Sequence, residues 1–129
     1  MRILVVEDEV DARQALVDVL QAASFETAAA ENGRAALEVL TRFRPDAIVL
    51  DLAMPDMGGD ELVEALGRDP QSRAVPVVIM SEWARSIAPP APVAAWLPKP
   101  FPPEELVALL RRLLLSPAVR AGGPATPAA

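Results

Sequence analysis

Acidic, hydroxyl and basic side chains stand where four short apolar stretches of the chain end. They are Glu7 and Asp8 after 2–6, Asp51 after 47–50, Ser81 after 75–80, and Lys99 after 93–97. Short apolar runs of this kind are typical of strands that a parallel sheet buries on both faces. The carboxyl ends of such strands meet at one edge of the sheet, where α/β proteins bind their ligands. We therefore expect these five side chains to gather around one site.

Three of the five side chains are carboxylates, and their charges decide what the site can hold. Glu7, Asp8 and Asp51 together bring three negative charges, and Lys99 returns one positive charge. A divalent cation would cancel the two that remain. Because the available ligands are all oxygen atoms, the ion should be a hard one, and Mg²⁺ held by carboxylates and water is the natural choice. The sequence therefore predicts a Mg²⁺ site at this edge.

Asp51 is the candidate reactive group. A metal and a lysine beside it would keep its carboxylate ionised, and an ionised carboxylate can attack phosphorus to form an aspartyl phosphate. The metal and Lys99 would neutralise charge on the transferring group, while the Ser81 hydroxyl would donate a hydrogen bond to one of its oxygens. Each residue alone has a simpler explanation as a cap, a turn residue or a solvated charge. The prediction therefore depends on the joint pattern.

The elements that must position these residues alternate between strands and helices. The expected strands lie at 2–6, 25–29, 47–50, 75–80 and 93–97, and the expected helices at 12–23, 32–43, around 62–66 and at 102–115. Such alternation produces right-handed crossovers and a parallel sheet with helices on both faces. The chain therefore predicts an α/β fold, a flavodoxin-like doubly wound sheet of five parallel strands in the order 2-1-3-4-5. In that order the first and third strands are neighbours where the strand order reverses.

Prolines interrupt the chain between the fourth and fifth expected strands. Pro89, Pro90 and Pro92 cannot lie inside a helix, so the fourth helix of such a fold should be short or irregular here. Beyond the last expected helix, residues 116–129 are rich in Pro, Ala and Gly and lack periodicity, as in a tail or linker. We therefore expect one domain at 1–115 followed by a tail or linker at 116–129.

The composition excludes several classes of function. The chain has 129 residues and a net charge of −6, which argues against a nucleic-acid surface. It contains no cysteine and no histidine, which excludes disulfides, thiolate metal sites and an internal histidine base. No apolar stretch approaches the roughly 18 residues of a membrane span, and the acidic N-terminus does not resemble a signal peptide. We expect a soluble, cytoplasmic domain that binds neither nucleic acid nor membrane.

Taken together, the motifs at the strand ends resemble those of the receiver domain of bacterial two-component response regulators, the fold of the chemotaxis regulator. The matching stretches are "VVEDE" (5–9), "VLDLAMPDMGG" (49–59), "VVIMSEW" (77–83) and "WLPKPF" (96–101). Their spacings are close to those of the family, and the resemblance covers roughly residues 1–115. It implies a phosphorylation-dependent signalling module rather than an enzyme, with its own Mg²⁺-dependent phosphotransfer and slow autodephosphorylation.

The resemblance also implies a role for each residue of the site. For the metal, the ligands would be Asp8 and Asp51 directly, Glu7 through water, and Ala53 through its backbone carbonyl. For the phosphoryl group, the roles would be Asp51 as acceptor, Ser81 as switch hydroxyl, Trp96 as switch aromatic, and Lys99 as the family's lysine, joined to Pro100 by a cis peptide bond. The donor would be a sensor histidine kinase or a histidine phosphotransfer protein. The signal would pass to an unknown downstream protein target.

The chain departs from the family pattern in two places. The segment between Ser81 and Lys99 is short and broken by prolines, and Trp96 is bulkier than the usual Tyr or Phe.

Three alternative functions are open. One alternative is a degenerate receiver that binds partners without phosphorylation. Another is a metal-dependent phosphatase, although Ala53 stands where such enzymes carry a second acid. The third is a flavin-binding domain, although "EDEVDARQ" (7–14) is acidic where a phosphate-binding loop should be.

Overall fold

The computed structural model, which describes residues 1–51, 59–81 and 93–115, is built on a five-stranded parallel sheet. The strands are β1 (Arg2–Val6), β2 (Glu26–Ala30), β3 (Ala47–Asp51), β4 (Val77–Ser81) and β5 (Val93–Pro98). Their order in the sheet is β2-β1-β3-β4-β5, and each neighbouring pair is parallel. The predicted α/β fold and strand order are therefore confirmed.

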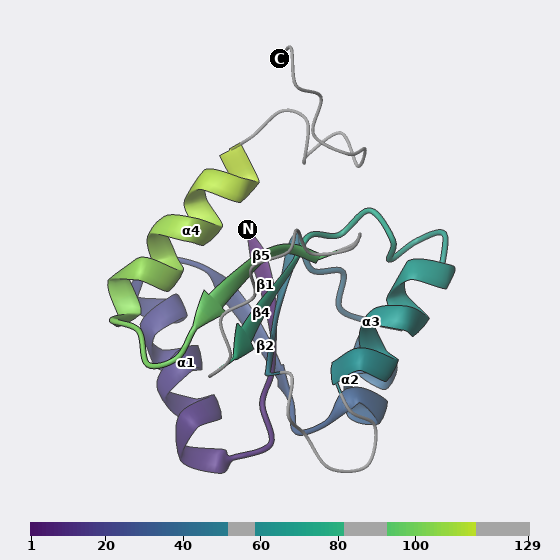
Figure 1. Ribbon diagram of the computed structural model, residues 1–129, viewed down its shortest axis with the longest axis horizontal. Helices are drawn as coiled ribbons and strands as arrows, with labels where there is room; N and C mark the ends of the chain where they lie inside the picture. Colours follow the sequence, from purple (N-terminus) through teal and green to yellow (C-terminus); the bar gives the residue numbers. More distant parts are fainter. Residues whose placement is uncertain (52–58, 82–92, 116–129) are drawn as a thin grey trace.

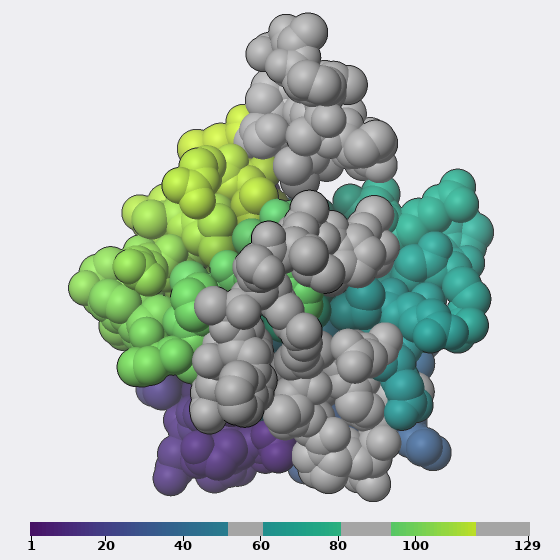
Figure 2. Space-filling model, viewed as in Figure 1, coloured from purple at the N-terminus to yellow at the C-terminus, as the bar shows by residue number. Residues whose placement is uncertain are grey.

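Helices cover both faces of the sheet. They are α1 (Val10–Ala22), α2 (Gly33–Val39), α3 (Gly59–Arg68) and α4 (Pro103–Leu115). Figure 1 shows α1 and α4 together on one side of the strands, and α2 and α3 together on the other. In the space-filling view of Figure 2, the surfaces of α4 and α3 likewise lie on opposite sides of the molecule. The sheet is thus the middle of three layers.

Alternating residues of the strands fill the two cores. Ile3 and Val5 pack with the cluster under α1 and α4, while Leu4 and Val6 pack with the cluster under α2 and α3. All four side chains are completely buried. A strand buried on both faces has no polar positions, which explains why these strands read as unbroken apolar runs in the sequence. Such a strand is held rigidly, and so is the residue that follows it.

Two helices begin on side-chain caps. Asn32 accepts a hydrogen bond of 2.8 Å from the backbone N–H of Ala35 and so forms the N-cap of α2. Glu9 caps α1 by accepting a hydrogen bond from the N–H of Asp11. The Glu9 cap fixes where α1 starts, directly after the acidic residues that leave β1.

Helix α2 ends earlier than its sequence pattern predicts. The apolar spacing favours a helix to residue 43, but α2 ends at Val39. The N–H of Thr41 bonds the carbonyl of Glu38, and the Thr41 hydroxyl donates to that same carbonyl at 2.7 Å. Threonine side chains compete for backbone groups in this way and favour turns over helix interiors. Phe43 still packs against the core, but from a position just after the turn and not from the helix.

The pairing of the strands brings the ends of β1 and β3 together. Val6 lies opposite Leu50, so the residues that follow β1 stand beside Asp51 at the end of β3. The N–H of Glu7 extends the ladder by bonding the carbonyl of Ala30 at 3.0 Å. The sheet therefore fixes the backbone of Glu7 and of Asp51 at the point where the strand order reverses.

Two expectations concern residues outside those described. The short or irregular fourth helix would lie within 82–92, and the tail or linker at 116–129 is likewise outside. The boundary at residue 115 between a domain and a tail or linker therefore stays a prediction. Within the described part of the chain, none of the helices has the length and hydrophobicity needed to cross a membrane.

The Asn32 cap should contribute measurably to stability. We expect Asn32→Ala to lower the free energy of unfolding by about 1 kcal/mol, because the N–H of Ala35 would lose its partner. Asn32→Asp keeps an acceptor at the same place and should lose much less. Urea denaturation of the three proteins measures the difference. A loss in Asn32→Asp as large as that in Asn32→Ala would contradict the capping role.

Candidate functional site

Three carboxylates converge at the carboxyl ends of β1 and β3. Glu7 and Asp8 directly follow β1, and Asp51 is the last residue of β3. One oxygen of each lies within 4.8 Å of one oxygen of each of the others. Glu7 and Asp51 are buried, with 3% and 8% of their surfaces exposed, whereas Asp8 is exposed. The cluster therefore has a buried floor and one acid that faces solvent.

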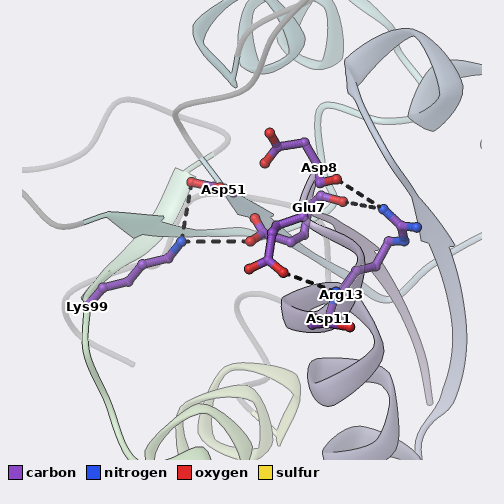
Figure 3. A network of polar contacts seen from close by, with 7 residues as sticks. Glu7, Asp8, Asp11, Arg13, Asp51 and Lys99 are labelled. Atoms are coloured by element: carbon purple, nitrogen blue, oxygen red, sulfur yellow. Dashed lines mark hydrogen bonds and ion pairs between the residues drawn. The ribbon is translucent and has the colours of Figure 1, made fainter.

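Lys99, which follows β5, reaches into this cluster. Its Nζ lies 3.5 Å from Oδ1 of Asp51 and 4.0 Å from Oε1 of Glu7, as the dashed lines in Figure 3 show. The lysine is half-buried, and the peptide bond that joins it to Pro100 is cis. Because the two acids are buried, this pairing is screened less by solvent than a surface ion pair would be. One ammonium group thus lies beside both buried acids.

Burial and the neighbouring acids shift the pKa of Glu7. Its pKa rises from 4.5 to about 8, and burial of the carboxyl group is the largest cause. A hydrogen bond with Asp51, the negative charge of Asp51 and the charge of Asp8 raise it further, while Lys99 lowers it. In the absence of a bound cation, Glu7 therefore holds a proton at neutral pH.

The donor set fits a divalent cation. The three side chains offer only oxygen atoms, which suits Mg²⁺. Oε2 of Glu7 is buried and has no hydrogen-bond partner within the described residues. A buried polar atom without a partner is costly, and a bound ion or its water would satisfy it. The fit rests on this oxygen and on the crowding of like charges.

The structure describes the other predicted site residues in less detail. Ser81 is the last residue of β4, where its backbone pairs with Pro98, and the position of its hydroxyl lies outside what is described. Trp96 lies in β5 and is half-buried against the core under α2 and α3. Ala53 falls outside the described residues. The structure thus brings together Glu7, Asp8, Asp51 and Lys99.

One residue of the site was missed by the sequence analysis. Arg13, in the first turn of α1, donates from Nη1 to the backbone carbonyls of Glu7 at 2.9 Å and Asp8 at 3.5 Å. Figure 3 shows Lys99 and Arg13 approaching the acids from opposite sides. The signal in the sequence was a basic residue in the first turn of a helix, where cations are disfavoured.

Comparisons with known proteins agree with this geometry. Residues 3–111 match the family model of the response regulator receiver domain. The chain is 33% identical to the chemotaxis protein CheY of Thermotoga maritima over 115 residues, which cover 87% of this chain and 96% of that one. The match of the family model across most of the chain decides the assignment.

This chain belongs to the response regulator receiver domain family. Receiver domains act in two-component signal transduction, as signalling modules rather than as enzymes in the usual sense. The resemblance noted in the sequence is therefore confirmed.

Solved receiver structures agree with the fold. CheY4 of Vibrio cholerae superposes with a TM-score of 0.76 at 32% identity, covering 88% of this chain and 98% of that one. The receiver domain of a sensor histidine kinase from Pseudomonas aeruginosa superposes with a TM-score of 0.78 at 25% identity, covering 89% and 98%. In that second structure a magnesium ion is coordinated in the active-site cleft.

The raised pKa of Glu7 gives this receiver a distinct dependence of stability on pH. The unfolded chain releases the Glu7 proton near pH 4.5, whereas the folded protein keeps it until about pH 8. Because the folded state binds more protons in this window, the free energy of unfolding should fall as pH rises through it. A tenfold difference in proton affinity corresponds to about 1.4 kcal/mol, so the effect is measurable.

The measurement is urea denaturation between pH 5 and pH 8 in the presence of a chelator, with Glu7→Gln as the matched control. The variant cannot titrate at this position, so the difference between the two proteins isolates Glu7. We expect the parent to lose stability relative to Glu7→Gln as pH rises. A difference that stays constant across the window would show that Glu7 is already ionised in the folded protein.

Proposed function

We propose that this receiver accepts a phosphoryl group on Asp51 from a phosphorylated histidine of a partner protein. The observation that carries the proposal is the position of Asp51, at the end of a fully buried strand with Lys99 Nζ at 3.5 Å and two further acids beside it. A carboxylate held in this way has its nucleophilic oxygen fixed before the donor arrives. The family supports the same assignment.

In the transfer, an oxygen of Asp51 attacks phosphorus while the bond from phosphorus to the histidine nitrogen breaks. The electron pair stays on the imidazole, which takes its proton from solvent. Lys99 would neutralise charge on the transferred group, and Ser81 would donate a hydrogen bond to one of its oxygens. The 129 residues contain no histidine, so the phosphoryl group must come from outside them, and the proposed donor is a sensor histidine kinase or a histidine phosphotransfer protein.

Mg²⁺ would be held by Asp8 and Asp51 directly, by Glu7 through water and by the backbone carbonyl of Ala53. When bound, it would supply positive charge for the transferring group. The buried oxygen of Glu7 and the magnesium ion in the Pseudomonas aeruginosa receiver support this assignment. Binding would require Glu7 to lose its proton, which links metal affinity to pH.

The phosphorylated state would be read by a downstream protein. Ser81 would serve as the switch hydroxyl and Trp96 as the switch aromatic, within a receiver unit at 1–115 that precedes a tail or linker at 116–129. Because histidine kinases obtain their phosphoryl group from ATP, the cytoplasm is the expected site of the transfer. A degenerate receiver that binds partners without phosphorylation is the alternative.

Phosphorylation of Asp51 is directly testable by intact mass. Incubation with acetyl phosphate and Mg²⁺ should add one phosphoryl group to the parent and none to Asp51→Asn. Asp18→Asn is the matched control, because Asp18 is an exposed carboxylate on α1, away from the cluster. This control should be modified like the parent. Modification of Asp51→Asn to the same extent would refute the assignment, and a parent that is never modified would favour the degenerate receiver.

Asp8 should control metal affinity. We expect Asp8→Asn to weaken Mg²⁺ binding by at least about tenfold, because it removes a charged ligand. Without metal the variant should be slightly more stable than the parent, since the Asp8 charge that repels Asp51 is gone. Asp11→Asn removes the same charge from the first turn of α1 but from outside the cluster. Calorimetric titration should find nearly parental affinity in Asp11→Asn, and equal affinities in the two variants would place the ion elsewhere.

A further inference from the structure

Arg13 stands where its charge is unfavourable. It lies in the first turn of α1, and the amino-terminal end of a helix disfavours cations. Across residues 1–51, 59–81 and 93–115, no carboxylate forms an ion pair with it. Its guanidinium instead reaches back across the start of the helix to the carbonyls of Glu7 and Asp8.

The direction of the side chain explains how the contact arises. Long side chains on a helix point towards its amino-terminal end, so an arginine in the first turn naturally reaches residues that precede the helix. The bond to the Glu7 carbonyl is 2.9 Å and partly buried, whereas the contact with Asp8 is longer, at 3.5 Å. Figure 3 shows the Asp8 carboxylate pointing away from the guanidinium. Arg13 therefore holds the backbone and leaves the carboxylate oxygens free for other partners.

We propose that Arg13 is a positioning residue of the metal site, which fixes the backbone after β1 so that the carboxylates of Glu7 and Asp8 face Asp51. The inference rests on the proposed Mg²⁺ site. Glu7 is held from both sides, because its N–H bonds Ala30 at 3.0 Å and its carbonyl bonds Arg13 at 2.9 Å. Asp8 is exposed and follows the last ladder bond, so its backbone depends more on Arg13. Without Arg13, repulsion among the acids would turn the Asp8 carboxylate outwards.

The charge of Arg13 and its hydrogen bonds have opposite effects on a cation. A guanidinium beside the site repels Mg²⁺, so removal of the charge alone would strengthen binding. Removal of the hydrogen bonds would misplace the ligands and weaken binding. Changes to groups that orient metal ligands typically reduce affinity by about 10- to 100-fold. The sign of the change therefore separates a positioning role from a purely electrostatic one.

The experiment is calorimetric titration of Mg²⁺ into the parent, Arg13→Ala, Arg13→Gln and Arg13→Lys at one pH and ionic strength. We expect the dissociation constant to rise about 10- to 100-fold in Arg13→Ala. Arg13→Gln, which keeps an N–H donor but is shorter, should weaken binding, and Arg13→Lys should weaken it least. Arg68→Ala is the matched control, because it removes the same charge from an exposed position on α3. This control should bind Mg²⁺ like the parent.

Phosphorylation by acetyl phosphate supplies a second measurement. At low Mg²⁺ the rate in Arg13→Ala should fall by the factor by which its dissociation constant rises. At saturating Mg²⁺ the rate should return to that of the parent, because the hydrogen bonds of Arg13 go to the backbone carbonyls of Glu7 and Asp8 and not to the acceptor Asp51. A rate that stays low at saturating Mg²⁺ would overturn the positioning role. If Arg13→Ala does not fold, the same Mg²⁺ titration and phosphorylation rates are measured on Arg13→Lys and Arg13→Gln.

The outcomes distinguish this inference from the proposed function. If the parent binds Mg²⁺ and is phosphorylated, but Arg13→Ala binds the ion equally well or more tightly, only the role of Arg13 fails. If the parent binds no Mg²⁺, the metal site itself fails and the inference fails with it.

Discussion

Repulsion among three carboxylates is the constraint on which the site depends. Glu7, Asp8 and Asp51 offer oxygens within 4.8 Å of one another, and the strands that carry them cannot move apart. Strands β1 and β3 are buried on both faces and paired on both edges, so any shift would break the ladder and open cavities. The repulsion must therefore be relieved by something that binds. The proton on Glu7, the ammonium of Lys99 and a divalent cation are the available partners.

The proton, the Lys99 ammonium and a divalent cation compete for the same carboxylate oxygens, so the binding of one changes how the others bind. Without metal, Glu7 keeps a proton to about pH 8 and Lys99 pairs with Asp51. A divalent cation would displace that proton, because both neutralise the same oxygens. A phosphoryl group on Asp51 would add negative charge close to Lys99, and the lysine would pair with it in place of Glu7. Signalling in this protein is thus proposed as a redistribution of positive charge around a fixed set of acids.

The sequence predicted the parts of the structure that follow from short-range patterns. Unbroken apolar runs located β1 and β3, and the residues that end them were therefore predicted to converge, as Glu7, Asp8 and Asp51 do. The early end of α2 was not predicted, because apolar spacing continues to Phe43 while the Thr41 hydroxyl ends the helix. The raised pKa of Glu7 and the reach of Arg13 were also missed, since burial and backbone direction exist only in the folded chain.

Lys99 and Arg13 stabilise the site by different means, and the chemistry of each side chain suits its task. Lys99 presents a compact charge on a flexible stem, which can move between Asp51, Glu7 and a phosphoryl group as the charge changes. Arg13 presents a planar group with several donors, which suits the fixed carbonyls of two consecutive residues. A mobile ammonium on one side and a fixed guanidinium on the other allow the charges to rearrange while the backbone stays in place. The acids can then change partners without changing position, as the proposed phosphoryl transfer would require.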